Sequence, residues 1–413
     1  MSTAEEVVAD YLTLGLRMDR LIDGYVDCWF GDPALAARVA AEPVHDPATL
    51  ARQASELLDR LPGADLHTDR RRFLTAQVRA VHCAARRAAG EPIGFLDEVR
   101  TYFDVEIGLG DPERYAAVHE AIGALLPGSG TLMERVEKFY ARNVVPPDRL
   151  GPAVRAVTDA LRERARPLLG LPTAERVEIE VVRDRPWNAF NRYHGGFRST
   201  VTLNETAGRT IAVLPLMSTH EAYPGHHVEH CLKEAGLVQQ RGWDEHRIAL
   251  VNTPQCLMAE GTAEHGAPAL LGPGWGRWTS ELLADQGVTV EGELVEQLVA
   301  LVNQLMPARQ DAAILLHDRG MPADDVVAYL HQWLLLPWDR AEQIVTFLVD
   351  PLWRAYSTTY VEGARLVGSW LAARPTEVPL IKRYRTLLTE QALPGQLHDD
   401  IIAEPADPVP MAS

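Results

Sequence analysis

Cysteine is scarce in this sequence, and its scarcity excludes a scaffold stapled by disulfides. Only four cysteines occur among 413 residues, at Cys28, Cys83, Cys231 and Cys256, and no two are spaced as CxxC. Wide spacing in a long chain is typical of reduced thiols that pack as small hydrophobic side chains. Cys231 and Cys256 flank a cluster of histidines, so a ligand role for either thiol remains an alternative.

Long apolar runs are also missing. No stretch reaches the roughly 18 uninterrupted apolar residues of a membrane-spanning helix. Residues 1–11 are acidic near their start and lack the basic-then-apolar pattern of a secretory signal. We therefore expect a cytoplasmic protein.

Basic residues are in deficit. The chain has 40 Lys and Arg against 57 Asp and Glu, which gives a formal net charge of −17. Such a charge repels the phosphates of nucleic acids and of anionic membranes, so we expect neither as a partner. The hydrophobic content of 46% is that of an ordinary globular protein.

Helical periodicity dominates the chain and predicts a mainly α fold. Apolar residues recur every three or four positions in 5–29, 47–61, 69–88, 112–126, 130–142 and 150–169, and again in 291–305, 308–318, 323–334, 338–348 and 351–373. Asp46-Pro47 and Asp111-Pro112 are typical of helix starts. Between the two helical regions, 176–204 has the alternation and β-rich composition of a small sheet of two or three strands.

These patterns predict a multi-helix architecture with a small sheet, built as a single catalytic unit over 1–413. Within it we expect a helical part, about 1–170, to pack on a part that carries the site, about 171–402. The Pro-rich segment 403–413 is predicted to be a disordered tail.

The most informative segment is a cluster of histidines. The chain holds 14 histidines, yet His220, His226, His227 and His230 fall within the eleven residues 220–230, together with Glu221 and Glu229. Imidazoles clustered with carboxylates are how proteins hold a divalent metal, usually zinc, and activate a water on it. We therefore expect one Zn²⁺ per chain.

The spacing allows two ligand sets. In an HExxH helix the two histidines are one turn apart, but His220 and His226 are six residues apart and would diverge by about 120° on a straight helix. Pro224-Gly225 lies between them and favours a kink that brings His226 back beside His220. The alternative is the inverted motif HxxEH, formed by His226 and His230 with Glu229 as the base.

A third ligand is expected from a later helix. Glu260 and Glu264 are the candidates, because they share a helix face at i,i+4. One of them would bind the metal while the other orients a histidine.

The string HEAYPGHH, followed by Glu260-Gly261 and an alanine two residues further on, resembles domain-of-unknown-function family 885, whose hallmark is HEAxPGHH and then EGWAxY. That family is distantly similar to zinc peptidases with HExxH and a later Glu, such as the Taq carboxypeptidase group. The resemblance implies a mostly helical peptidase-like fold with the site in a cleft. It covers about residues 195–370.

Residue by residue, the resemblance matches His220 and Glu221 to the leading HE, His226 and His227 to the trailing HH, and Glu260 to the later Glu. It also matches Asn204 to an Asn of the preceding strand, and Tyr360 and Gly363 to a late Tyr-x-x-Gly. The sequence departs from the family at Thr262, at His265 and at Arg354-Ala355-Tyr356, where Pro-Gly-Gln is usual.

From these matches we expect a metallopeptidase or amidase acting on a peptide or small amide. His220, His226 and Glu260 would bind zinc, Glu221 would be the general base, and Tyr360 or His227 would stabilise the oxyanion. An alternative in which His227, His230 or Glu264 replaces one of these ligands stays open.

The departures from the family pattern favour keeping a second functional hypothesis, a metal-dependent enzyme of another reaction class that acts on a specialised small molecule. A di-iron helical oxidase and a non-catalytic binding protein are the remaining alternatives. The sequence predicts neither the cleavage mode nor the oligomeric state.

Overall fold

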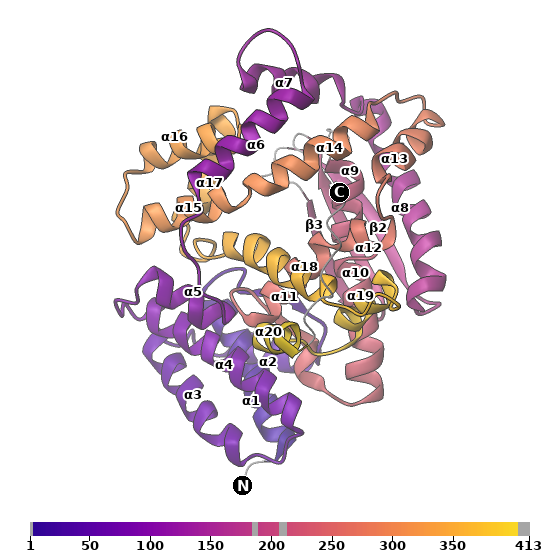
Figure 1. Ribbon diagram of the computed structural model, residues 1–413. Helices are drawn as coiled ribbons and strands as arrows, with labels where there is room; N and C mark the ends of the chain where they lie inside the picture. The colour runs from indigo at the N-terminus through magenta and orange to yellow at the C-terminus, as the bar shows by residue number, and fades with distance from the viewer. Residues whose placement is uncertain (1–2, 184–188, 206–212, 404–413) are drawn as a thin grey trace.

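The computed structural model describes residues 3–183, 189–205 and 213–403, and in these ranges helices dominate (Figure 1). The predicted fold class, mainly α with a small sheet, is confirmed. Most of the predicted C-terminal tail lies outside the described residues, which end at Ala403.

The N-terminal region is a series of helices joined by short connections. They are α1 (Ala4–Leu21), α2 (Pro33–Ala41), α3 (Pro47–Arg60), η1 (Leu61–Gly63), α4 (Thr68–Ala88), α5 (Phe95–Phe103), α6 (Pro112–Leu125), α7 (Leu132–Arg142) and α8 (Pro147–Leu169). The predicted caps are present: the Asp46 carboxylate accepts from the amide of Thr49, and that of Asp111 from the amide of Glu113. The helix predicted over 5–29 is too long, because α1 ends at Leu21.

The described residues form two small sheets. The strand β1 (Val26–Trp29) pairs antiparallel with β5 (Ile248–Leu250), so this sheet joins distant parts of the chain. The predicted sheet over 176–204 has three strands, β2 (Arg176–Val182), β3 (Ala189–Gly195) and β4 (Arg198–Asn204), in the order β2-β4-β3. In it β2 is parallel to β4 and β3 is antiparallel.

The C-terminal region returns to helices. Its elements are α9 (Val213–Glu221), α10 (His226–Lys233), η2 (Glu234–Gln240), η3 (Asp244–Arg247), α11 (Pro254–Glu264), α12 (Gly266–Leu270), α13 (Trp275–Ala284), α14 (Gly292–Val302), η4 (Asn303–Leu305), α15 (Pro307–His317), α16 (Ala323–Trp333), α17 (Trp338–Val349), η5 (Thr359–Gly363), α18 (Ala364–Ala372), α19 (Leu380–Thr389) and α20 (Pro394–Ala403). The continuous helix predicted over 351–373 is wrong in its first part, where residues 351–356 form turns before η5 begins.

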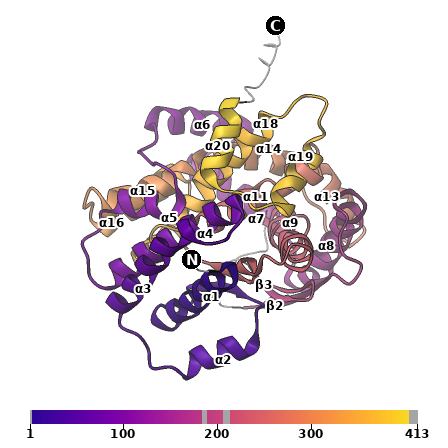
Figure 2. The same cartoon turned by 90° about the horizontal axis from the view of Figure 1, so that it is seen from below.

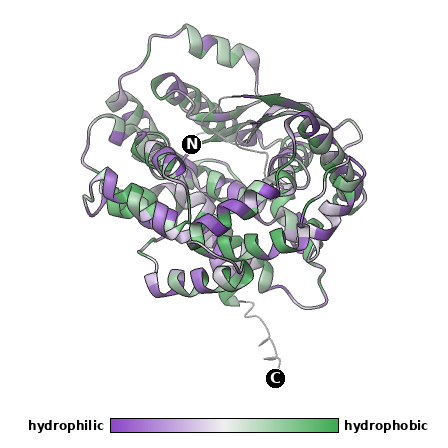
Figure 3. Cartoon of the chain, turned by 90° about the horizontal axis from the view of Figure 1, so that it is seen from above, coloured by the Kyte–Doolittle hydropathy of each residue, from purple (hydrophilic) through white to green (hydrophobic). Residues whose placement is uncertain are grey.

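The helices surround a shared apolar core. One cluster of buried side chains includes Tyr11 and Tyr102 from the N-terminal region and Leu257 and Tyr384 from the C-terminal region. Helices α1 to α4 lie on one side of the molecule, α8 and α13 lie on the other, and α11 lies between them (Figure 2). Most helices carry both hydrophobic and hydrophilic residues, as partly buried helices do (Figure 3). Within the described ranges, no helix is long and apolar enough to span a bilayer.

Candidate functional site

The histidine cluster lies where two helices meet. Helix α9 ends at Glu221 and α10 begins at His226, so the segment 222–225 interrupts the helix at the predicted place. The peptide bond between Tyr223 and Pro224 is cis.

Gly225 allows the two helix ends to approach. Its amide donates to the carbonyl of Thr219 at 2.8 Å. A Cβ on Gly225 would lie 1.9 Å from the carbonyl oxygen of His220, so any larger residue would displace the start of α10. The close approach brings His226 back beside His220.

Three predicted ligands are brought together. Nε2 of His220 and Nε2 of His226 are 3.1 Å apart. Oε2 of Glu260, on α11, lies 3.2 Å from Nε2 of His220, and its Oε1 lies 3.5 Å from Nε2 of His226. One possible donor atom from each of the three residues lies within 4.8 Å of the other two. Among the described residues, these three side chains form the group that could hold a metal ion.

The electrostatics of the group are dominated by carboxylates. Burial alone would lower the pKa of His220, but Glu260 and Glu264 overcome it and raise that pKa well above its usual value. For Glu260, burial raises the pKa, and the two histidines outweigh it and hold the pKa far below its usual value. Oε2 of Glu260 is buried and accepts no hydrogen bond in the described part of the chain.

Two neighbours contact two of the three candidate ligands. The Tyr356 hydroxyl donates to Oε1 of Glu260 at 2.7 Å. Oε1 of Glu264 lies 3.5 Å from Nδ1 of His220, the ring nitrogen that faces away from the other two ligands. Glu260 therefore lies beside both histidines, whereas Glu264 lies beside the other nitrogen of the His220 ring.

Glu221 and Tyr360 line the same cleft as His220. Burial raises the pKa of the Glu221 carboxyl, and the nearby His220 and His226 lower it only in part. The Asn191 side-chain amide donates to the backbone carbonyl of Glu221 at 2.6 Å and so fixes the end of α9. Burial and the charge of Glu260 raise the Tyr360 pKa well above its usual value, which keeps the phenol protonated.

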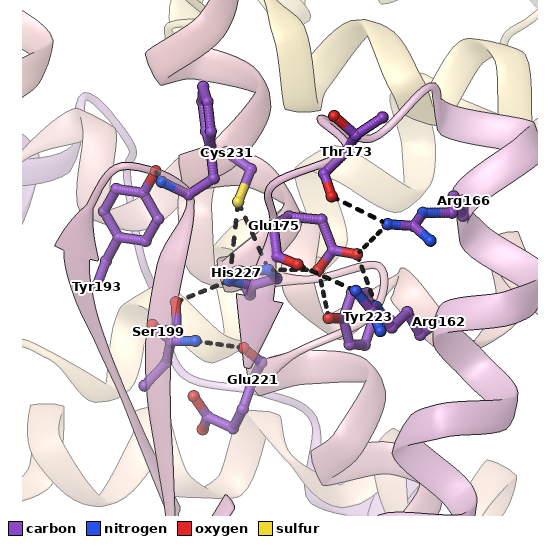
Figure 4. A network of polar contacts seen from close by, with 12 residues as sticks. Arg162, Arg166, Thr173, Glu175, Tyr193, Ser199, Glu221, Tyr223, His227 and Cys231 are labelled. Carbon is purple, nitrogen blue, oxygen red and sulfur yellow. Dashed lines mark hydrogen bonds and ion pairs between the residues drawn. The ribbon is translucent and has the colours of Figure 1, made fainter. Parts of the chain in front are cut away.

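His227 is fully buried and belongs to a network of polar contacts (Figure 4). Its Nδ1 lies 2.8 Å from the Ser199 hydroxyl, and its Nε2 lies 3.3 Å from Oε2 of Glu175. The Tyr223 hydroxyl and the Arg162 guanidinium also donate to Glu175, at 2.6 and 2.7 Å. The carboxylate of Glu221 points away from this network (Figure 4). His227 is therefore placed to anchor the start of α10, and its predicted alternative role as an oxyanion donor is wrong.

The inverted motif is not assembled. The His230 ring stacks on Tyr193, with ring centroids 4.7 Å apart. The Glu229 carboxylate accepts from Nζ of Lys233 at 2.5 Å. Neither residue belongs to the group of three that surrounds Glu260.

The thiols stay outside the group of ligands. All four cysteines are free. Sγ of Cys231 lies 3.5 Å from Nε2 of His227, in the buried network, and burial raises the pKa of Cys256 well above its usual value. These contacts favour the interpretation of the cysteines as packing residues.

The cleft is large, with a volume of about 2590 Å³. Small-molecule pockets occupy about 300–1,000 Å³, so this cleft has room for an extended chain. Its lining includes residues of β1, β3, α9, α14, α15, α17 and the segment around Tyr356 and Tyr360. His226 and Glu260 border a small adjoining cavity of about 50 Å³, which shares Asp27 and Tyr356 with the cleft.

In the three-stranded sheet, β3 is the strand that lines the cleft. Strand β4 pairs with β2 on one edge and β3 on the other, so it has no free edge for a peptide. Strand β3 pairs with β4 alone in this sheet, and its Phe190 and Arg192 line the cleft.

Sequence reasoning missed several residues of the site. Glu175 lies in the turn before β2, and its partners are remote in the sequence, so no local signal marks it. Tyr356 was counted only as a departure from the family pattern, although it contacts Glu260 directly. Arg309 had no motif at all, yet it lines the cleft together with Glu221 and Tyr360.

Comparisons with known proteins bear on the fold. No protein-family model matches the chain, and no curated protein matches it. Among solved structures, it is similar to a "putative lipoprotein" from Colwellia psychrerythraea, with a TM-score of 0.55, 15% identity, and coverage of 86% of this chain and 66% of that one. A "putative lipoprotein of unknown function" from Shewanella oneidensis gives a TM-score of 0.49 and 12% identity, over 90% of this chain and 76% of that one.

The Colwellia similarity shows a shared fold, and this chain spans 66% of that protein's length. The predicted cytoplasmic location is contradicted, because the Colwellia protein of this fold is described as a putative lipoprotein and lipoproteins are anchored at membranes. The resemblance to family 885 stays a prediction, since neither neighbour bears on it.

Proposed function

We propose that this protein is a metal-dependent hydrolase, a zinc peptidase or amidase. His220, His226 and Glu260 would bind the metal and Glu221 would be the general base. The observation that carries the proposal is the spacing of the donor atoms, at 3.1, 3.2 and 3.5 Å. Four donors at about 2.0–2.1 Å from zinc in a tetrahedron are roughly 3.3 Å apart. The observed spacings are close to this value, with each oxygen of Glu260 facing one of the two imidazoles.

The chemistry of the donors also fits zinc. Two imidazole nitrogens and one carboxylate oxygen form a common catalytic set, which leaves a position for water. Oε2 of Glu260 is buried without a hydrogen bond, and a cation satisfies such an atom. A bound zinc ion supplies Lewis acidity and lowers the pKa of a coordinated water toward about 7.

The remaining steps belong to side chains of the cleft. Glu221 accepts a proton from the attacking water and returns it to the leaving amine, and its raised pKa makes it a stronger base than an ordinary carboxylate. Tyr360 keeps its phenolic proton and donates a hydrogen bond to the oxyanion of the substrate. Asn191 holds the backbone of Glu221 and so limits the positions of the base.

Metal content measured by mass spectrometry tests the ligands. Protein purified without added metal is expected to hold about one zinc per chain, and His220→Ala is expected to lose it. His230→Ala is the matched control, because His230 stacks on Tyr193 outside the group of ligands, and it should retain the metal. Wild-type protein that takes up no zinc even when zinc is offered would contradict the proposal.

A second measurement tests the base and the reaction class. Glu221→Gln is expected to keep the metal and lose nearly all turnover of a peptide library. An active Glu221→Gln variant would remove Glu221 as the base. A metal-replete wild type that cleaves no peptide or amide would favour the alternative, an enzyme of another reaction class on the same scaffold.

A further inference from the structure

Four aromatic side chains follow one another along one side of the cleft, and we call them the aromatic wall. They are Phe347, near the end of α17, and Trp353, Tyr356 and Tyr360 from the segment after it. The Trp353 ring stacks on that of Phe347, with centroids 5.6 Å apart, and meets that of Tyr356 edge to face at 5.1 Å. The Tyr356 and Tyr360 rings also meet edge to face, at 5.5 Å. The wall is therefore a continuous aromatic surface.

One end of the wall lies at the candidate site. The Tyr356 hydroxyl donates to Oε1 of Glu260 at 2.7 Å, and Tyr360 lines the cleft together with Glu221. The Phe347 ring is 6.2 Å from the Tyr356 ring, so the far end of the wall is only one ring further on. An extended chain advances about 3.3 Å per residue, and its side chains project to alternate faces. A substrate whose amide reaches Glu221 therefore has its adjacent side chain within reach of the wall.

The packing of the protein leaves these rings partly uncovered. All four are only partly buried. Trp353 and Tyr356 pack against the main apolar core, but neither core cluster of the described residues includes Phe347 or Tyr360. Ile344, one turn before Phe347 on α17, lines the cleft as well. Apolar surface that faces a cleft gains free energy when another apolar group covers it, and such surfaces commonly mark binding sites.

A cation braces the wall. Arg309, in the first turn of α15, has its central guanidinium carbon 5.5 Å from the centroid of the Phe347 ring and 5.4 Å from that of Tyr360. A guanidinium over a ring is attracted to it and restricts its orientation. Rings that are already ordered lose little conformational entropy when a ligand binds. They also favour a second ring over an aliphatic group of similar size, because edge-to-face and offset-stacked rings attract one another beyond the area that they bury.

We propose that the aromatic wall binds an aromatic side chain of the substrate, next to the reacting amide. This inference rests on the proposed function, because the candidate site places the amide, but recognition of the side chain requires no metal. The substrate class is thus a peptide or amide that carries a phenylalanine-like ring beside the reacting bond. Amides with only small aliphatic side chains are poor ligands of the same cleft.

Binding to the full chain after treatment with a chelator tests the inference. The probes are three tripeptides of alanine, X and alanine, blocked as N-acetyl and C-terminal amide, in which X is phenylalanine, cyclohexylalanine or alanine. The blocked ends remove terminal charges from the comparison. Titration calorimetry should show that the phenylalanine peptide binds at least about tenfold more tightly than the alanine peptide. It should also bind about threefold more tightly than the cyclohexylalanine peptide, whose ring has similar bulk but no π-system.

Variants assign the effect to the wall. Phe347→Leu and Trp353→Leu each keep an apolar side chain and remove a ring. Each should weaken binding of the phenylalanine peptide by about threefold or more and leave binding of the alanine peptide unchanged. Trp338→Leu is the matched control. Trp338 belongs to the same helix as Phe347, but its ring is 52% exposed, stacks on His331 and is absent from the lining of the cleft, so this variant should keep the full preference.

Three outcomes would overturn the inference. The first is equal binding of the phenylalanine and alanine peptides by the wild type, including no measurable binding of either. The second is equal binding of the phenylalanine and cyclohexylalanine peptides, which would make the wall a general apolar surface. The third is a phenylalanine affinity that neither Phe347→Leu nor Trp353→Leu changes.

Each outcome can be seen without metal, so a failure here is distinct from a failure of the zinc and turnover measurements. Circular dichroism would detect unfolding of a variant. If one variant unfolds, the other carries the test, and the comparison of the three peptides on the wild type decides the question in every case.

Discussion

Gly261 of α11 and Gly363 of η5 meet backbone to backbone. A Cβ on Gly261 would lie 2.3 Å from the carbonyl oxygen of Gly363. Gly261 directly follows Glu260, and Gly363 lies three residues after Tyr360. The contact between the glycines therefore sets the distance between a candidate ligand and the tyrosine of the cleft.

The first prediction concerns this contact. Gly261→Ala is expected to lower the free energy of unfolding by more than about 3 kcal/mol, because backbone atoms cannot move aside as a flexible side chain can. Gly63→Ala is the control, since a Cβ there meets no atom within 4 Å, and it should change stability by less than about 1 kcal/mol. Urea denaturation measures both, and equal losses would contradict the close approach.

The second prediction concerns a buried ion pair at the interface of distant segments. Glu98 is buried between Arg87, at 3.2 Å, and Arg354, at 2.7 Å. Arg354→Met removes one cation and should destabilise the protein by about 3–5 kcal/mol. Arg86→Met breaks only the exposed pair with Glu91 and should cost no more than about 1 kcal/mol. Similar losses in thermal unfolding for the two variants would refute this assignment.

The third prediction uses the network of Figure 4. Burial raises the pKa of Glu175, but hydrogen bonds from His227, Tyr223 and Arg162 outweigh it and lower that pKa to about 2. A carboxyl with a lowered pKa stabilises the fold above its unfolded-state pKa, near 4.5, and this contribution is lost as the pH falls toward 2.

Glu175→Gln should therefore be destabilised most near neutral pH. Its deficit relative to the wild type should shrink as the pH falls from about 4.5 toward 2, where the wild-type carboxyl becomes protonated. Urea titrations at pH 7, 5, 4 and 3 measure this difference. A deficit that stays constant over this range would show that the carboxylate charge is not the cause.

The fourth prediction separates two tyrosines of the cleft. Tyr356→Phe removes the hydrogen bond to Glu260 and should weaken zinc binding by about 10–100-fold, as loss of a ligand's supporting contact does. Tyr360→Phe makes no such contact and should keep the zinc affinity while lowering turnover. Chelator competition measures the affinities, and a Tyr360→Phe variant that loses zinc would exchange the two assignments.

The local signals of the sequence predicted the local structure. Asp46 and Asp111 cap helices where their side chains and the following prolines indicated, and Pro224-Gly225 interrupts the helix beside His220. Asp32-Pro33 carries the same signal for α2, which the sequence analysis overlooked. These features depend on residues within a few positions of one another, which is why a sequence reveals them.

The remaining features depend on contacts between distant residues. β1 was predicted as helix, because its pairing with β5 has no local signal. Tyr356 and Glu175 matter through partners far along the chain, and a pattern of spacings does not contain them. The spacing of the histidines allowed two ligand sets. The tertiary structure distinguishes them, because α11 brings Glu260 beside His220 while His230 stacks on Tyr193.

The pairing of β1 with β5 also orders events during synthesis on the ribosome. Val26 is made early, but its partner Leu250 emerges only after His220 and His226 have been translated. The first helices can form as they emerge, whereas the edge of β1 stays open to wrong partners until then. Glu260 follows β5 by only a few residues, so the last strand of this sheet and the last candidate ligand leave the ribosome almost together.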